Sequence, residues 1–189
     1  MRVPVTGGAP QLVLSGRIEG LRCAKSPAAL CAIAERTSDE KQLVLTAFDP
    51  MNGRGRELGR FGINPDTAYM WDLSPDGTQI ALAHSGKGAI HVLAFAGRAP
   101  LEITPTSWNS LETLNWAADG KGLFAASRTE ESAVRLYIDL KGNMHTVWEK
   151  QGTLGNESAG SLGIPSPDGR HLAMMNFTHN ANMWAMEDF

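Results

Sequence analysis

The sequence lacks long hydrophobic runs and a surplus of charge, and both shortages exclude classes of protein. No stretch approaches the roughly 18 consecutive apolar residues of a membrane-spanning helix, and residues 1–4 do not begin an apolar secretion signal. The formal charge of −3 provides no basic excess for a nucleic-acid backbone or an anionic membrane. We therefore expect no nucleic acid among the partners and no membrane contact by this chain itself.

Familiar catalytic and metal-binding motifs are also missing. The sequence has no Gly-x-Gly-x-x-Gly loop, no His-Arg-Asp catalytic loop and no Asp-Phe-Gly metal site, so the parts of phosphoryl transfer are absent. Its five histidines show neither the His-Glu-x-x-His pattern nor the Cys/His spacing of a zinc site. On this basis we predict no catalytic residue, cofactor or metal ligand, and expect that the chain is not an enzyme.

What the sequence does contain is a repeat. Its 20 glycines and 10 prolines disfavour a helical bundle and suit short strands joined by turns. Three segments align on an Asp-Gly pair, at Asp76-Gly77, Asp119-Gly120 and Asp168-Gly169, with intervals of 43 and 49 residues between the aspartates. Asp-Gly between alternating apolar runs is a strong hairpin signal, and the interval is that of a four-stranded propeller blade.

The residues around these turns predict further strands. Third strands are expected at 90–95, 134–139 and 182–186, and fourth strands at 101–104 and 144–148. A fainter copy has Ser26-Pro27 where the second unit has Ser74-Pro75, but Ala28-Ala29 stand in place of Asp-Gly, and its strands are expected at 30–34 and 42–48. Residues 2–5 and 11–14 resemble the last two strands of an earlier unit.

The predicted fold is therefore an all-β propeller of about four four-stranded antiparallel blades in a single domain, residues 1–189. Within it, residues 1–14 would end a preceding blade, 15–62, 63–105 and 106–150 would each form a blade, and 151–189 would form a final blade without its fourth strand. We expect the C-terminal part of a larger propeller rather than a ring closed at four blades.

Two signature segments carry a family resemblance. Residues 73–82 (Leu-Ser-Pro-Asp-Gly-Thr-Gln-Ile-Ala-Leu) and 165–173 (Pro-Ser-Pro-Asp-Gly-Arg-His-Leu-Ala) resemble the TolB-like, WD-repeat-like propeller repeats of bacterial proteins. More narrowly, residues 31–36, 114–124 and 182–189 are similar to the C-terminal region of bacterial eukaryotic-type serine/threonine kinases. This resemblance implies a sensory or scaffolding module on the extracytoplasmic side, with a kinase domain encoded upstream; the sequence itself leaves a cytoplasmic location open.

The leading functional interpretation is a module that binds a protein or peptide partner, or a small ligand, through the loops between blades. The alternatives are an enzyme such as a hydrolase or lyase with its site in the propeller channel, and a propeller accessory to a peptidase. A half-propeller that pairs with missing blades or with another copy is a further alternative. Each of these functions depends on a site and not on the fold.

Five residues outside the turns are candidates for a specific role. Cys23 and Cys31 would face each other across a hairpin centred near Pro27, and would form a disulfide in an oxidising compartment or two buried thiols in a reducing one. Trp108, between two blades, is a candidate partner contact. Arg54 and Arg56 belong with Arg60 to the one basic cluster, which would either receive an acidic peptide or phosphate or, as we favour, keep a long hairpin turn soluble.

Overall fold

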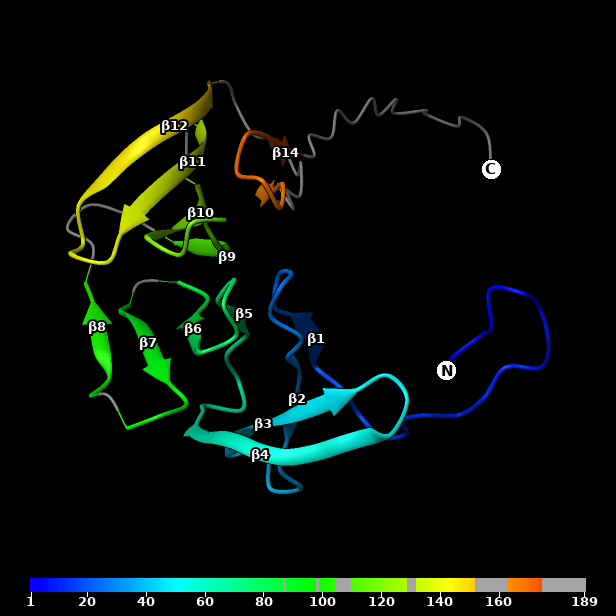
Figure 1. Ribbon diagram of the computed structural model, residues 1–189. Coiled ribbons are helices and arrows are strands. Elements are labelled where there is room, and N and C mark those ends of the chain that lie inside the picture. The colour runs from blue at the N-terminus through cyan, green and yellow to red at the C-terminus, as the bar shows by residue number, and fades with distance from the viewer. Residues whose placement is uncertain (87, 98, 105–109, 129–131, 152–162, 175–189) are drawn as a thin grey trace, which may run out of the picture.

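The computed structural model describes residues 1–86, 88–97, 99–104, 110–128, 132–151 and 163–174. Within these ranges the chain is all-β, with fourteen strands in four antiparallel sheets and no helix (Figure 1). It follows that no helix in the described part is long and apolar enough to cross a membrane.

Each sheet is a simple meander in which consecutive strands pair. The first sheet contains β1 (Gly20–Cys23), β2 (Cys31–Arg36), β3 (Gln42–Asp49) and β4 (Gly53–Gly62). The second contains β5 (Tyr69–Leu73), β6 (Gln79–His84), β7 (Ile90–Ala94) and β8 (Leu101–Ile103). The third contains β9 (Leu111–Trp116), β10 (Gly122–Arg128), β11 (Ser132–Asp139) and β12 (Met144–Gln151), and the fourth consists of β13 (Gly163–Pro165) and β14 (Leu172–Met174).

The sheets are arranged as propeller blades. Their first strands lie toward the middle of the molecule, where β1 contacts β5, β5 contacts β9 and β9 contacts β13, while β4, β8 and β12 lie at the periphery (Figure 1). The predicted fold class, an all-β propeller of four-stranded antiparallel blades, is confirmed.

The hydrophobic core lies between the sheets. On β6, Ile80 and Leu82 pack toward the first sheet, whereas Ala81 and Ala83 pack toward the third, as the two-residue period of a strand requires. On β2, Ala32 and Ala34 face the second sheet in the same way. Each of these second strands therefore presents alanines to the following blade, and β6 presents larger aliphatic side chains to the preceding one.

The basic cluster lies in a strand and not in the long turn that the sequence predicted. β4 begins at Gly53, so Arg54, Arg56 and Arg60 all lie on it. The turn itself is short because the Asp49 carboxylate accepts a hydrogen bond from the backbone of Met51 (2.7 Å). The sequence did not predict β4 as a strand, because it is a largely exposed outer strand whose charged residues show no apolar alternation.

The predicted terminal strands have a different outcome. Residues 2–5 and 11–14 form one isolated bridge, between Arg2 and Gln11, instead of two strands. Val3, Val5 and Leu12 are all exposed, so among the described residues no hydrophobic face is packed behind the bridge, and an isolated pair of strands without one is marginal in water. The predicted strand at 182–186 falls outside the described residues.

Candidate functional site

The connections between the first and second strand of each sheet, here called the inner turns, occupy residues 24–30, 74–78, 117–121 and 166–171. In the second of them the backbone N–H of Gly77 donates to the Ser74 carbonyl (2.9 Å), and Gly77 has φ of 71°. The Ser74 hydroxyl and the Thr78 N–H both donate to the Asp76 carboxylate, at 2.6 and 3.1 Å. Each residue of the pair thus has its own role: the glycine adopts the left-handed backbone, and the aspartate provides a hydrogen-bond acceptor inside the turn.

The third and fourth inner turns repeat this backbone. Gly120 and Gly169 have φ of 68° and 71°, and the Asp119 and Asp168 carboxylates accept N–H bonds from Lys121 (3.0 Å) and Arg170 (3.1 Å). The third turn differs in having Ala117 where the others have serine. Among the described residues, the Lys121 N–H is therefore the one hydrogen-bond donor to the Asp119 carboxylate. It bonds Oδ1, and Oδ2 receives no hydrogen bond from these residues.

The first inner turn has a different construction. Its Ser26–Pro27 peptide is cis, and the Ala28 N–H donates to the Lys25 carbonyl (2.9 Å). Cys23 and Cys31 are directly opposed in the β1–β2 register, with Cα atoms 3.9 Å apart, and are joined by a disulfide at the base of the turn.

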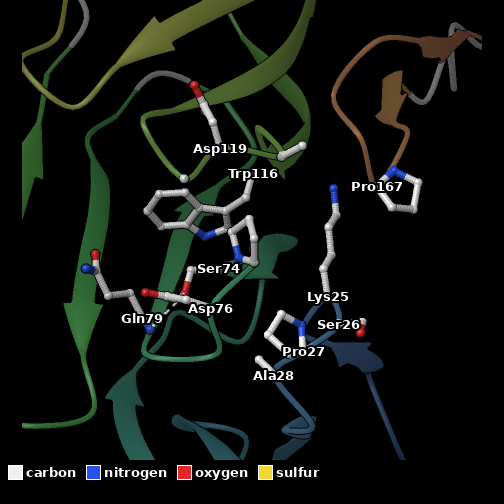
Figure 2. Close-up of a pocket in the computed structure, with 13 residues that line it drawn as sticks. Lys25, Ser26, Pro27, Ala28, Ser74, Asp76, Gln79, Trp116, Asp119 and Pro167 are labelled. Atoms are coloured by element: carbon white, nitrogen blue, oxygen red, sulfur yellow. Dashed lines mark hydrogen bonds between the residues drawn. The ribbon is translucent and has the colours of Figure 1, made fainter.

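The four inner turns surround a cavity of about 610 Å³, here called the turn cavity (Figure 2). All four sheets contribute to its lining, which consists of Lys25, Ser26, Pro27, Ala28, Ser74, Pro75, Asp76, Gln79, Trp116, Ala118, Asp119, Gly120 and Pro167. The Lys25 N–H also donates to the Pro75 carbonyl (2.9 Å), so the first and second inner turns are joined directly. Convergence of equivalent turns places residues that are far apart in sequence around one opening.

The turn cavity carries charges of both signs. The Lys25 ammonium extends from the first turn toward the fourth, where Ser166 O lies 3.5 Å away, at the limit of a hydrogen bond (Figure 2). Burial would raise the pKa of Asp76, but hydrogen bonds from Ser74 and Thr78 outweigh it and hold the pKa below its ordinary value. Asp76 is therefore ionised at neutral pH, and the cavity offers a cation beside carboxylates.

A partly buried aspartate, Asp72, joins three sheets at the wall of the turn cavity. The Asp72 carboxylate accepts a hydrogen bond from the Trp116 backbone N–H (2.8 Å), and the Asp72 carbonyl accepts one from the Trp116 indole (3.2 Å). Arg22 lies 3.6 Å from the same carboxylate and over the Trp71 ring, with 5.6 Å to its centroid. Asp72 thereby connects β1, β5 and β9, and its burial raises its pKa.

Sequence analysis missed Lys25 and Asp72. A usable signal existed for Asp72, because it is a lone carboxylate in the largely apolar strand Tyr69–Leu73 and requires partners where that strand is packed. Lys25 had no such signal, since its place depends on how the first sheet packs beside the second and fourth.

The structure separates the predicted site residues into groups. Asp76, Asp119 and Gly120 line the turn cavity, whereas Asp168 and Gly169 line an adjoining one. Arg54 lies on β4 and is paired with Glu35, with its Nε 3.0 Å from a carboxylate oxygen.

The other basic residues and Trp108 do not add to the turn cavity. Arg60 pairs with Glu57 at 2.9 Å, and Arg56 is exposed on the same strand. Trp108 lies outside the described residues. Among those that are described, no group of three or more His, Cys, Asp or Glu side chains is placed to hold a metal ion.

Comparison with known proteins finds similarity at the level of structure. No protein-family model matches the chain, and no curated protein sequence does. The structure of TolB from Acinetobacter baumannii superimposes with a TM-score of 0.64 over 95% of this chain and 43% of TolB, at 20% identity. The fold is that of a TolB-like β-propeller.

Two other solved structures are similar to this chain. Hydrazine synthase from Kuenenia stuttgartiensis matches with a TM-score of 0.57 over 85% of this chain and 44% of its own, at 19% identity. A putative 6-phosphogluconolactonase from Bacteroides uniformis matches with a TM-score of 0.50 over 80% and 48%, at 13% identity. The chain thus spans less than half the length of each of these proteins, and identities this low establish the fold alone.

These similarities correct one expectation. The prediction that the chain is not an enzyme rested on missing sequence motifs, and it is wrong as an inference, because proteins with enzyme names have the same fold at equally low identity. A propeller assembles a site from turns far apart in sequence, as the turn cavity illustrates, so a linear motif is not needed. Neither the fold nor the missing motifs decides whether this chain has an activity.

Proposed function

We propose that this chain is a binding module that takes an extended segment of a protein partner into the turn cavity. The observation that carries the proposal is the convergence of four inner turns, one from each sheet, on a single opening of about 610 Å³. That volume lies within the range of about 300–1,000 Å³ typical of ligand sites.

The chemistry of the lining favours a peptide segment. Pro27, Pro75 and Pro167 supply rigid apolar surface, which a partner can cover without ordering flexible side chains. Lys25 can bind a carboxylate or backbone carbonyl of the partner, while Asp119 can accept a hydrogen bond from an N–H group. The sites lie on turns held by a rigid sheet scaffold, as is usual for recognition loops.

We further propose that the module is the sensory or scaffolding part of a larger bacterial signalling protein, for example a serine/threonine kinase. Support comes from the resemblance of residues 31–36 and 114–124 to the C-terminal regions of such kinases. The Cys23–Cys31 disulfide suits an oxidising, extracytoplasmic location for such a sensor.

Selection from a random peptide library against the purified chain, followed by calorimetry, tests the binding function. We expect selected peptides to lose about tenfold in affinity in both Lys25→Ala and Asp119→Asn, because each change removes a charge-assisted contact. Lys41→Ala and Asp66→Asn are matched controls, because both residues are exposed and line neither the turn cavity nor its neighbour. Selected peptides whose affinity is the same in all four variants, or turnover of a sugar lactone by the chain with no peptide selected, would contradict the proposal.

A further inference from the structure

A second cavity adjoins the turn cavity and has a different chemistry. It has a volume of about 450 Å³, lies between the third and fourth sheets, and is here called the aromatic groove. Ala118, Asp119 and Pro167 line both cavities, so a partner in one reaches the other without leaving the surface.

The wall of the aromatic groove is formed by two rings that are not part of the buried core. Phe124 on β10 and Tyr137 on β11 are register partners, each only partly buried, and their rings meet edge to face with centroids 5.4 Å apart. Gly122 makes this position of Tyr137 attainable, because a Cβ there would lie 2.6 Å from the Tyr137 ring and hydroxyl. β10 therefore has a glycine at the position where the Tyr137 ring crosses it.

The electrostatic environment of Tyr137 is negative. Burial raises the pKa of the Tyr137 hydroxyl, and the carboxylates of Asp119 and Asp139 raise it further. The Asp139 carboxylate is occupied by its own turn, through bonds from Lys141 (2.8 Å) and Asn143 (2.9 Å), whereas among the described residues Asp119 accepts one bond, on Oδ1. Asp119 is thus the carboxylate available to a ligand.

Positive groups near the groove only partly offset this field. Arg170 lines the groove, but it is exposed and extends toward Asp168, with 3.9 Å between its Nε and the carboxylate. His171 also lines the groove and is exposed, and Lys121 and Lys141 are exposed on the turns that carry Asp119 and Asp139. The His145 ring packs against the Tyr137 ring, with centroids 5.2 Å apart, but is not part of the groove lining. Within the lining, Asp119 and the faces of the aromatic rings attract a cation.

We propose that the aromatic groove is a subsite for a cationic side chain, an arginine or a lysine, of the segment bound in the turn cavity. The cation lies against the Tyr137 ring and pairs with Oδ2 of Asp119, a combination of cation–π and ionic contacts that suits guanidinium best. This assignment rests on the proposed function for the identity of the partner, but the subsite itself is testable without one.

The experiment uses a small probe and the intact chain. N-acetyl-arginine methylamide is titrated into protein with isotope-labelled tyrosine rings, and the ring signals of Tyr137 are followed by NMR, with Tyr69→Phe used to assign them. The uncharged isostere N-acetyl-citrulline methylamide and the anionic N-acetyl-glutamate methylamide are titrated in parallel. We expect a saturable shift with the arginine probe. The affinity of the citrulline probe should be at least fivefold lower, and added salt should lower the affinity of the arginine probe.

Variants separate the two contacts. Asp119→Asn should lower the affinity for the arginine probe about fivefold to tenfold. Phe124→Leu, observed through the remaining Tyr137 signals, should lower it less. Asp66→Asn is the control and should leave the titration unchanged. If the citrulline or glutamate probe binds as well as the arginine probe, or if Asp119→Asn has no effect, the subsite is not cationic and the inference is overturned.

The result is independent of the peptide selection. A saturable arginine response together with a failed selection would leave the subsite standing and remove the proposed partner class. Selected peptides that bind the turn cavity while the arginine probe never saturates would keep the binding function and remove the subsite.

Discussion

The first and second inner turns meet at one hydrogen bond, from Lys25 N–H to the Pro75 carbonyl, yet they are built from different chemistry. The second turn closes itself with noncovalent bonds among Ser74, Asp76, Gly77 and Thr78. The first has no carboxylate and no left-handed glycine, and it is closed by the Cys23–Cys31 disulfide instead. A propeller can therefore place equivalent loops around one opening by a local hydrogen-bond network or by a covalent bond.

The largest expected effect comes from removing that covalent bond. Cys23→Ser with Cys31→Ser should lower the free energy of unfolding by about 2.5 kcal/mol, because the disulfide closes a short loop whose ends are then free in the unfolded chain. Urea denaturation measures the change. A dithiol reductant should destabilise the wild type similarly and leave the double variant unaffected; equal stability of oxidised and reduced wild type would show that the first turn does not need its bond.

Glycine replacement sharpens the comparison within the self-closed turns. Gly77→Ala should lower the free energy of unfolding by about 2 kcal/mol. The alanine would have to keep the positive φ of this position, and its Cβ would lie 3.2 Å from Ala24 and 3.3 Å from Leu30 of the first turn. Gly120→Ala has the same backbone strain but meets no atom within 4 Å, so about 1 kcal/mol is expected. Equal losses in thermal denaturation would mean that the contact between the first two turns contributes nothing.

Aspartate replacement should have a smaller effect. Asp76→Ala removes an acceptor for the Ser74 hydroxyl and for both the N–H and the hydroxyl of Thr78, and should cost about 1 to 2 kcal/mol. Asp119→Ala removes one backbone bond and should cost about 0.5 kcal/mol. Chemical denaturation of both variants checks the order; a larger loss for Asp119→Ala would show that its carboxylate supports the fold rather than a ligand.

The smallest expected effect is a difference in acid sensitivity. The pKa of Asp76 is lower in the folded chain than in the unfolded one, so its stabilising contribution is present above the unfolded pKa and is lost as the pH falls through the folded pKa. Asp76→Asn should therefore flatten the loss of stability below about pH 4. The double cysteine variant should shift the whole stability curve downward without changing its slope, since the first turn has no carboxylate to titrate.

The parts of this molecule that could be predicted from the sequence are those determined by residues close together in the chain. The Asp-Gly pairs and the alternation of Ile80 with Leu82 are local signals, so the inner turns and the central strands could be predicted. β4 could not, because an exposed outer strand is free to carry arginine and glycine in place of a pattern. The place of Lys25 depends on contacts between sheets, which no local signal encodes. Asp72 did have a local signal, a lone carboxylate in an apolar strand, but its partners on other sheets could not be read from it.

The unequal faces of β6 have a consequence for how the chain avoids misfolding. If this strand slipped by one residue against its neighbours, Ile80 and Leu82 would enter the narrow gap that Ala81 and Ala83 now fill, and holes would open on the other side. Both errors would be penalised at once. The alternation of bulky and small side chains thus favours the one strand register in which each face of β6 matches the spacing to its neighbouring blade.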